Sequence, residues 1–501
     1  MRKGLMLSLC FVCALAALSI GAWATDPDDP NPDGLVWPMH LAGDQIPGSP
    51  AVAVGDAMTV NLVLAGDGNP DNYAIQMTSV NSGSGSYLWW DGYGGGWMPG
   101  QGPPVHDREF TLGAKFKIDQ ISHIPTGGPS ADLLHIKPHS SGAANPAVGI
   151  VIRCKQKTNL GEVIDTGGVP HLWFCLYKCP EDSGTEQLLY DFGPVVYGQW
   201  ERVYIYTCID PTPRAVCYMD GVKVYDNTFS TGLPTYSASE CAFGPLIYHG
   251  ENQVGMTLDW IAANNWLVTP PAPGITTVDA AKKAAGGSGV SLSDLTVAQM
   301  LYDDEGDLFS FAAEMASRCS GIRMLVNPNT VFHLQSGEFT LNPGDKIAVT
   351  GLTCEVEGER VIRAAEVTVI STGNDLPQPL AMTNRATGGG GYGAQGAVTD
   401  DATVSPARMC VGASNLSLLT TIFGKVTYAT TFGVPGSHFY IDDGSGLRDG
   451  SGNVGIKCVS AIGQDVPTLD QYVTATGVMG VRQIAGCNVR NFWAETWNPV
   501  P

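Results

Sequence analysis

Two copies of one strand pattern occupy the second half of this chain, and they constrain its fold more than any single residue does. Each copy has a long first strand, an aromatic-rich second, a short third, a strand that ends at Thr-Gly or Thr-Ala-Thr-Gly, and a last strand. The segments are 290–301, 308–311, 320–326, 345–351 and 360–367 in the first copy, and 416–428, 438–446, 453–459, 470–477 and 489–495 in the second. This repeat predicts two small β-structures of the same kind.

The second copy also resembles a known family. Gly424 and Val426 begin a pattern that continues as F-x-I-x-D-G-S-G from Phe439 and ends as G-I-x-C-V from Gly455. The pattern resembles the OB-fold of the nucleic-acid-binding type, a small five-stranded barrel. The resemblance implies one OB-like barrel at 289–372 and a second at 377–501, near a glycine-rich segment at 388–396.

The charges of these barrels argue against nucleic acid as their partner. Residues 289–372 contain 12 acidic and five basic side chains, and residues 411–501 contain six and five. A groove that follows phosphates needs a positive stripe and stacking rings, but the second copy offers only Tyr428 and Tyr440 and no such stripe. The whole chain, with a formal net charge of −21, repels nucleic acid and anionic lipid. We therefore expect no nucleic-acid partner, and contacts with proteins or glycans instead.

The first half consists of short strands separated by turns. Strands are predicted at 58–65, 72–80, 110–118, 147–154, 171–177, 186–192, 202–208, 215–219, 222–225 and 256–262. With 62 Gly, 33 Pro and only 15% charged residues, the composition favours turns and strands over helical bundles. We expect an all-β chain whose residues 35–268 form a β-sandwich.

One hairpin of this half carries a second resemblance. Trp200 opens a strand, Asp220 and Gly221 form a hairpin turn, and the last strand has Asp259 followed by Trp260. These features resemble the concanavalin A-like lectin/glucanase sandwich of the laminin G type. The resemblance implies an N-terminal jelly-roll β-sandwich, whose concave face often binds polysaccharide, before the two small five-stranded OB-like barrels. We assign Trp200 and Trp260 to the sandwich core.

The first 24 residues have the pattern of an export signal. Arg2 and Lys3 precede an apolar run that ends at Ile20, and Ala22-Trp23-Ala24 forms a small-x-small cleavage site. The run is short for the ~20 residues of a membrane span. We expect residues 1–24 to be removed and the chain to be secreted, extracellular or at the cell surface, with no membrane span after cleavage.

Proline-rich segments separate the predicted parts. Residues 25–34 form a Pro/Asp linker that cannot build a core. Residues 269–288 form a second linker, which starts as Thr-Pro-Pro-Ala-Pro-Gly and contains a short helix at 278–285. Eleven cysteines remain after signal removal, and a disulfide between Cys208 and Cys217 is plausible in an oxidising compartment.

The run from Tyr87 to Trp97 is the strongest candidate for a carbohydrate site. Aromatic rings on Gly-rich loops stack on the flat C–H faces of sugars, and a nearby Asp can bond hydroxyl groups. The candidate contacts are Trp89, Trp90, Asp91, Tyr93 and Trp97. The alternative is that half of these rings fill the sandwich core or cover its edge.

Catalytic signals are weak. A retaining glycosidase needs two carboxyl groups ~5–5.5 Å apart, which on one strand requires a spacing of two or four residues. Glu162 and Asp165 are three apart, so a strand would place them on opposite faces. No nucleophile elbow, zinc motif or Walker loop is present.

One acidic turn could bind calcium. Asp67, Asn69 and Asp71 place oxygen donors at alternate positions, as a calcium loop would. The segment departs from the EF-hand, because Asn72 stands where that loop needs Gly and Thr78 where it needs Glu. An Asx-rich hairpin turn is the alternative, so no cofactor is certain and Ca²⁺ is possible.

The sequence therefore predicts a secreted, non-catalytic carbohydrate-binding or cell-surface adhesion protein whose partner is a polysaccharide or glycan. Two alternatives stay open. One is an extracellular glycoside hydrolase of the concanavalin-like fold, and the other is a structural surface or matrix protein whose barrels contact other surface proteins.

Overall fold

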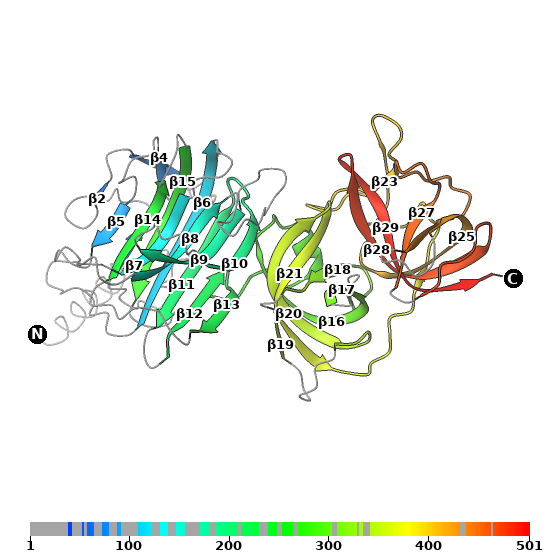
Figure 1. The fold of residues 1–501 in the computed structure, drawn as a ribbon, viewed down its shortest axis with the longest axis horizontal. Helices are drawn as coiled ribbons and strands as arrows, with labels where there is room; N and C mark the ends of the chain where they lie inside the picture. The colour runs from blue at the N-terminus through cyan, green and yellow to red at the C-terminus, as the bar shows by residue number, and fades with distance from the viewer. Residues whose placement is uncertain are drawn as a thin grey trace, which may run out of the picture.

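The computed structural model describes residues 39–42, 53–54, 58–64, 73–79, 88–91, 109–122, 131–138, 147–155, 171–179, 187–208, 212–229, 239–247, 253–264, 269–302, 308–327, 330–333, 341–430, 437–461 and 464–500. Regular structure in these ranges is strand apart from the helix α2 (Val278–Lys283). A sandwich, a first barrel and a second barrel follow one another along the long axis (Figure 1). No helix in the described ranges is long and apolar enough to cross a bilayer.

Two antiparallel sheets form the sandwich. Their orders are β13-β12-β11-β6-β15-β4-β3, with β1 beside β15, in the first sheet, and β10-β9-β8-β7-β14-β5-β2 in the second. The first sheet contains β1 (Met39–Ala42), β3 (Met58–Leu64), β4 (Tyr73–Ser79), β6 (Glu109–Ser122), β11 (Trp200–Cys208), β12 (Arg214–Met219), β13 (Val222–Thr228) and β15 (Gln253–Asn264). The second contains β2 (Ala53–Val54), β5 (Leu88–Asp91), β7 (Ala131–Pro138), β8 (Ala147–Lys155), β9 (His171–Cys179), β10 (Gln187–Pro194) and β14 (Ser239–Ile247).

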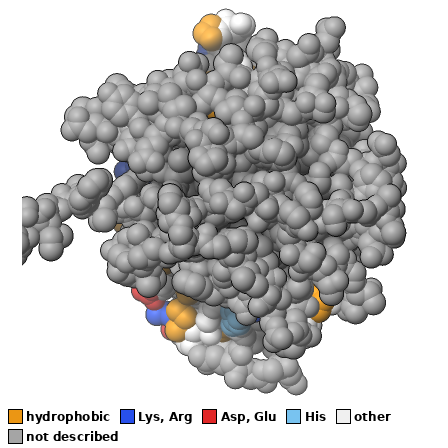
Figure 2. Space-filling view, turned by 90° about the vertical axis from the view of Figure 1, so that its left-hand side faces the viewer, with side chains coloured by type: hydrophobic (Ala, Val, Ile, Leu, Met, Phe, Trp, Pro, Cys, Tyr) orange, Lys and Arg blue, Asp and Glu red, His pale blue; other side chains and the backbone are white. Residues whose placement is uncertain are grey.

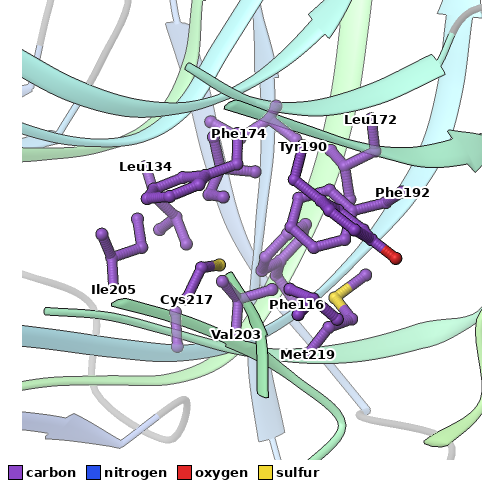
Figure 3. Packing of buried hydrophobic residues seen from close by; sticks show 14 of the residues in the cluster. Phe116, Leu134, Leu172, Phe174, Tyr190, Phe192, Val203, Ile205, Cys217 and Met219 are labelled. Carbon is purple, nitrogen blue, oxygen red and sulfur yellow. The ribbon is translucent and has the colours of Figure 1, made fainter. Parts of the chain in front are cut away.

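Apolar side chains from both sheets meet in one core. Every second residue of β6 points inward, so that Leu112, Ala114 and Phe116 are fully buried. Phe174 and Tyr190 reach the same core from the second sheet (Figure 3). Burial of an aromatic side chain of this kind stabilises the fold by about 1.5–3 kcal/mol. A slip of one residue in the register of β6 would turn Leu112, Ala114 and Phe116 away from the core, so burial fixes the register.

The first barrel follows α2. It contains β16 (Gly289–Tyr302), β17 (Leu308–Met315), β18 (Gly321–Leu325), β20 (Lys346–Val356) and β21 (Glu359–Ser371), with β19 (Val331–His333) beside β21. The strand order is β18-β17-β16-β20-β21, and β18 pairs in parallel with β21. That last pairing closes the five strands into a barrel.

The second barrel repeats this arrangement. It contains β25 (Leu419–Ala429), β26 (His438–Asp442), β27 (Ile456–Ser460), β28 (Tyr472–Ile484) and β29 (Cys487–Pro499), and β22 (Leu380–Ala381) extends it beside β25. The third and fifth strands, β27 and β29, are again parallel, and β28 pairs with β25 to complete the ring. A separate hairpin joins β23 (Thr399–Asp401) to β24 (Arg408–Met409). The repeat in the sequence thus corresponds to two barrels with the same strand order.

A buried carboxylate connects the two barrels. Glu359, 1% exposed, accepts hydrogen bonds from Arg323 Nε at 3.2 Å and Nη2 at 3.0 Å within the first barrel. It also accepts from Ser417 Oγ at 3.1 Å and from the backbone N–H of Val481 at 3.3 Å in the second. The Arg323 guanidinium lies over the Trp493 ring, 4.9 Å from its centroid. These charge-assisted bonds hold the barrels together.

Polar contacts join the sandwich to the first barrel. Oδ2 of Asp220, in the β12–β13 turn, accepts from the backbone N–H of Gly289 at 3.3 Å. Lys223 forms an ion pair with Glu366 at 3.3 Å. Arg363 of β21 donates to the carbonyl oxygen of Asp191 in β10. The first barrel is therefore held against the β13 edge of the first sheet and the β10 edge of the second.

The disulfide considered between Cys208 and Cys217 does not form. Cys217 opposes Ile205 across β11 and β12, and its free thiol points into the sandwich core. The side chain of Cys208 points to the opposite face of the sheet, where it packs in a cluster of buried tyrosines. The two sulfur atoms are on opposite faces of one sheet, which no disulfide can bridge.

Candidate functional site

The outer face of the first sheet, which points away from the core, carries a buried group of tyrosines. Tyr204, Tyr206 and Tyr218 are each at most 9% exposed, and Tyr204 opposes Tyr218 across the β11–β12 pair. These residues alternate with core residues such as Val203 and Ile205. The outer face of a sheet is more often solvated and polar, so this aromatic lining distinguishes this part of the molecule.

Charged groups continue this outer face toward the start of β11. Lys115 forms a buried ion pair with Asp259, with 2.9 Å between Nζ and Oδ2. Nearby, Thr257 Oγ1 donates to Asp119 Oδ2 at 2.6 Å. A bulge in β15 between Leu258 and Trp260 sets Asp259 opposite β6. The Asp259 carboxylate offsets much of the charge that Lys115 would otherwise bring into the interior.

A pocket of about 260 Å³ opens at this end of the face. Its walls come from β6, the start of β11, the β12–β13 turn and the segment that leads into the first barrel. The lining residues are Lys115, Trp200, Glu201, Arg202, Asp220, Pro273, Gly274, Ile275, Ser288 and Gly289. The opposite end of the sandwich, turned away from the barrels, shows described side chains only in small patches (Figure 2).

Trp200 is the aromatic wall of this pocket. Its side chain is partly buried, and the ammonium groups of Lys117 and Lys115 lie 4.7 and 5.7 Å from the ring centroid. The assignment of Trp200 to the core was therefore wrong. Trp200 is the first residue of β11 and alternates with Glu201, so its ring lies on the outer face of the sheet rather than between the sheets.

Two carboxyl groups line the pocket, and they differ in how they are held. Asp220 has φ +49° in a two-residue turn with Gly221 (φ +80°), the turn that the Asp-Gly pair predicts. Its Oδ1 accepts from the backbone N–H of Arg202 at 3.2 Å and its Oδ2 from that of Gly289. Both oxygens of Asp220 thus accept from the backbone and hold the turn.

Glu201 is held much less completely. It is 7% exposed, and its Oε1 accepts from Gln199 Nε2 at 2.9 Å. Its Oε2 is buried and has no hydrogen-bond partner among the described residues. Burial, with a smaller contribution from the charge of Asp220, raises the pKa of Glu201 well above its ordinary value.

The residues that the sequence nominated for sugar binding lie elsewhere or outside the described ranges. Trp89, Trp90 and Asp91 belong to β5 of the second sheet, opposite Ala242, Cys241 and Glu240 of β14. They do not line the Trp200 pocket. The described ranges include neither Tyr93 and Trp97, nor the calcium candidates Asp67, Asn69 and Asp71, nor Glu162 and Asp165.

No cluster of three or more His, Cys, Asp or Glu side chains that could hold a metal ion occurs among the described residues. The sequence did not predict this pocket, because its residues come from four segments of the chain. The first and the last of these segments are more than 150 residues apart. The one local signal was the Gln-Trp-Glu sequence at 199–201, just before an apolar strand.

Comparison with known proteins gives structural likenesses only. No family model matches the chain, and no curated protein matches its sequence. An endo-β-1,4-glucuronan lyase from the fungus Trichoderma reesei is 15% identical over 47% of this chain and 98% of its own, with a TM-score of 0.32. A family 16 endo-glucanase from Bacteroides ovatus is 10% identical over 45% of this chain and 99% of its own, with a TM-score of 0.28. An alginate lyase from a Chlorella virus is 10% identical over 42% of this chain and 92% of its own, with a TM-score of 0.26. These three are carbohydrate-active enzymes by name, and they assign no role to any residue of this chain.

Proposed function

We propose that this chain is a secreted, non-catalytic carbohydrate-binding or cell-surface adhesion protein that holds sugar on an aromatic part of its sandwich. We infer a concanavalin-like jelly roll at 35–268 and OB-like barrels at 289–372 and 377–501. The common strand order of the two barrels, each with a parallel pair between its third and fifth strands, supports the second inference.

The observation that carries this proposal is the pocket beside Trp200. An indole ring at the wall of a cavity can cover the C–H face of a sugar, while polar groups around it bond the hydroxyls. The volume of about 260 Å³ is slightly below the roughly 300–1,000 Å³ typical of pockets for drug-sized ligands. It suits a short stretch of a saccharide rather than a large cofactor.

Substitution of the ring tests the proposal. Trp200→Ala should weaken retention of the mature chain in gels that contain a bound polysaccharide by about tenfold or more, since removal of a buried aromatic anchor costs 2 kcal/mol or more. Phe423→Ala, which truncates a 43% exposed ring on the second barrel, is the matched control and should not change retention. Equal retention of wild type and Trp200→Ala would refute the assignment of this pocket.

A glycoside hydrolase is the second candidate, because two carboxyl groups line one pocket and burial raises the pKa of one of them, Glu201. A raised pKa is what a carboxyl group needs to act as a general acid. The partner would have to be Asp220, whose two oxygens already accept from the backbone N–H groups of Arg202 and Gly289. A base or nucleophile needs a lone pair aimed at the reacting atom, so we favour binding without catalysis. Sugar release that Glu201→Gln abolishes would reverse this preference.

Three further proposals concern segments outside the pocket. The run containing Trp89, Trp90, Asp91, Tyr93 and Trp97 remains a candidate second sugar contact, and residues 1–24 a removable export signal. Asp67, Asn69 and Asp71 remain the candidate calcium ligands. A structural surface role, with the barrels in contact with other proteins, is the reading left if no polysaccharide binds.

A further inference from the structure

Glu314 is a buried carboxyl group at the contact between the two barrels. It is 0% exposed and alternates with the core residues of β17, so its side chain lies on the outer face of that strand. Gly321 opposes Glu314 across β17 and β18, and a Cβ atom on Gly321 would overlap the carbonyl oxygen of Ser417 in the second barrel. Neither carboxyl oxygen of Glu314 has a hydrogen-bond partner among the described residues. Because a buried polar atom without such a partner is costly, Glu314 weakens the contact it occupies.

Arg318, in the turn between β17 and β18, is the cation beside this carboxyl group. Its Nε lies 3.6 Å from Glu314 Oε2, which is too far for a hydrogen bond. Its Nη1 donates to the carbonyl oxygen of Gln378, in the connection between the barrels, and its Nη2 to that of Leu419, the first residue of β25, at 3.2 Å. Arg318 therefore holds the second barrel and leaves Glu314 without a hydrogen bond.

We propose that Glu314 makes the contact between the barrels sensitive to pH: when its carboxyl group ionises, it draws Arg318 away from Gln378 and Leu419, and the contact loosens. The charge change occurs at Glu314. The element that it biases is the Arg318 side chain, which has two alternative sets of acceptors, the two carbonyl oxygens or the Glu314 carboxylate. The inference does not depend on the sugar pocket, since it shares none of the residues that line it.

The two sets of acceptors compete for the same donors. An ionised carboxylate is bound best by two N–H groups of one guanidinium, and Arg323 binds Glu359 in this way, through Nε at 3.2 Å and Nη2 at 3.0 Å. Arg318 can offer Glu314 two such donors only if it gives up a bond to Gln378 or to Leu419. A neutral carboxyl group attracts the guanidinium much less, so it leaves those bonds in place.

Burial sets the direction of the pH effect. It raises the pKa of Glu314, and the charge of Arg318 offsets only part of that rise. Where the contact is open and the carboxyl group is hydrated, the pKa returns toward the ordinary Glu value of about 4.3. The stability that neutral Glu314 gives to the closed contact is therefore fully present below about pH 4.3. It is lost as the pH rises through the raised pKa.

The other charged groups near this contact can be separated from Glu314. Two ion pairs lie on the neighbouring strands of the first barrel, Arg323 with Glu359 and Lys346 with Asp294. Lys282, at the carbonyl oxygen of Leu416, has its pKa lowered to about 8 by burial, above the acidic range in which Glu314 acts. Residues 416–419 of the second barrel carry no charge. Glu495 of β29, an exposed residue whose pKa is also raised, serves as the control.

Hydrogen–deuterium exchange of the full mature chain, read by mass spectrometry and corrected for the intrinsic exchange rate at each pH, tests the inference. Protection of residues 416–421 in wild type should fall by about tenfold between about pH 5 and about pH 7.5, since one unit of pKa shift corresponds to about tenfold. Protection of β27, in the same barrel, should change by less than about threefold. This comparison does not depend on the folding of a variant. Equal protection of 416–421 at both pH values would overturn the inference.

Three variants assign the response to its residues. Glu314→Gln cannot ionise, so its protection of 416–421 should agree within about threefold at the two pH values. Glu495→Gln should keep the full wild-type response. Arg318→Met, which lacks the donors to Gln378 and Leu419, should exchange rapidly at both pH values. A full response in Glu314→Gln or in Arg318→Met, or loss of the response in Glu495→Gln, would overturn the inference.

Discussion

The backbone N–H of Gly289 donates to Oδ2 of Asp220 at 3.3 Å, so the first residue of the first barrel is bonded to a hairpin turn of the sandwich. The approach is close: a Cβ atom at Gly289 would lie 2.3 Å from the carbonyl oxygen of Asp220. The same contact forms one wall of the Trp200 pocket. The pocket therefore depends on how the sandwich and the first barrel meet.

Gly289→Ala should destabilise this junction, because the added methyl group would overlap backbone that cannot rotate away. Overpacking of this kind costs about 1–3 kcal/mol, and the midpoint of thermal unfolding should fall. Gly274→Ala is the control, since a Cβ atom there has nothing within 4 Å. An unchanged midpoint for Gly289→Ala would mean that the sandwich and the barrel are not packed as described.

Loss of Glu359 should weaken the contact between the barrels. Glu359→Ala would leave Arg323, 4% exposed, as a buried charge without its carboxylate, which costs about 3–5 kcal/mol. Lys425→Ala, which removes one partner of the exposed Lys425–Asp470 pair, should cost less than about 1 kcal/mol. Denaturant unfolding of both variants measures the difference. Similar small losses would show that Glu359 does not hold the interface.

Lys282 should make stability depend on alkaline pH. Burial lowers the pKa of Lys282 to about 8, and its Nζ donates to the Leu416 carbonyl oxygen at 3.3 Å. Between about pH 8 and the ordinary Lys value near 10.4, the unfolded chain binds a proton that the folded chain has released. The contribution of Lys282 to the free energy of unfolding therefore rises with pH across that window, by up to about 3 kcal/mol. This contribution is lost again as the pH falls through 8.

The comparison with Lys282→Met isolates this effect from other groups that titrate at high pH. The free energy of unfolding of wild type relative to Lys282→Met should rise between pH 7.5 and 10.5. A constant difference over that range would contradict the buried position of the Lys282 ammonium group.

Calcium dependence tests the turn at Asp67. If Asp67, Asn69 and Asp71 bind Ca²⁺, EDTA should lower the thermal midpoint of the wild-type chain, because a ligand that binds only the folded state stabilises it. Asp67→Asn with Asp71→Asn should remove that EDTA effect, and Asp119→Asn, on the outer sheet face, should not. No response of wild type to EDTA would favour a plain Asx turn.

The strands were easier to predict than the site, for a physical reason. Strands β3 and β6 alternate apolar and polar residues over many positions, so the sequence alone indicated their place and type. The strands β5 and β14 were not predicted, because β5 is four residues long and β14 contains Gly244 and Pro245, which are typical of turns.

The pocket could not be predicted at all from local pattern. A Trp at the start of an apolar strand looks like a core residue, and whether Trp200 faces the core depends on the register of β11 against β6, where Trp200 opposes Lys117. The other walls come from a hairpin turn and from the segment before β16, which only the tertiary fold brings together.

The most direct test of the central claim is a pull-down of the mature chain, from Thr25, on a panel of insoluble polysaccharides, with an assay of released sugar in the supernatant. We predict retention on at least one polysaccharide, loss of that retention in Trp200→Ala, and no released sugar. Release of sugar would contradict a non-catalytic role, and no retention on any polysaccharide would contradict carbohydrate binding itself.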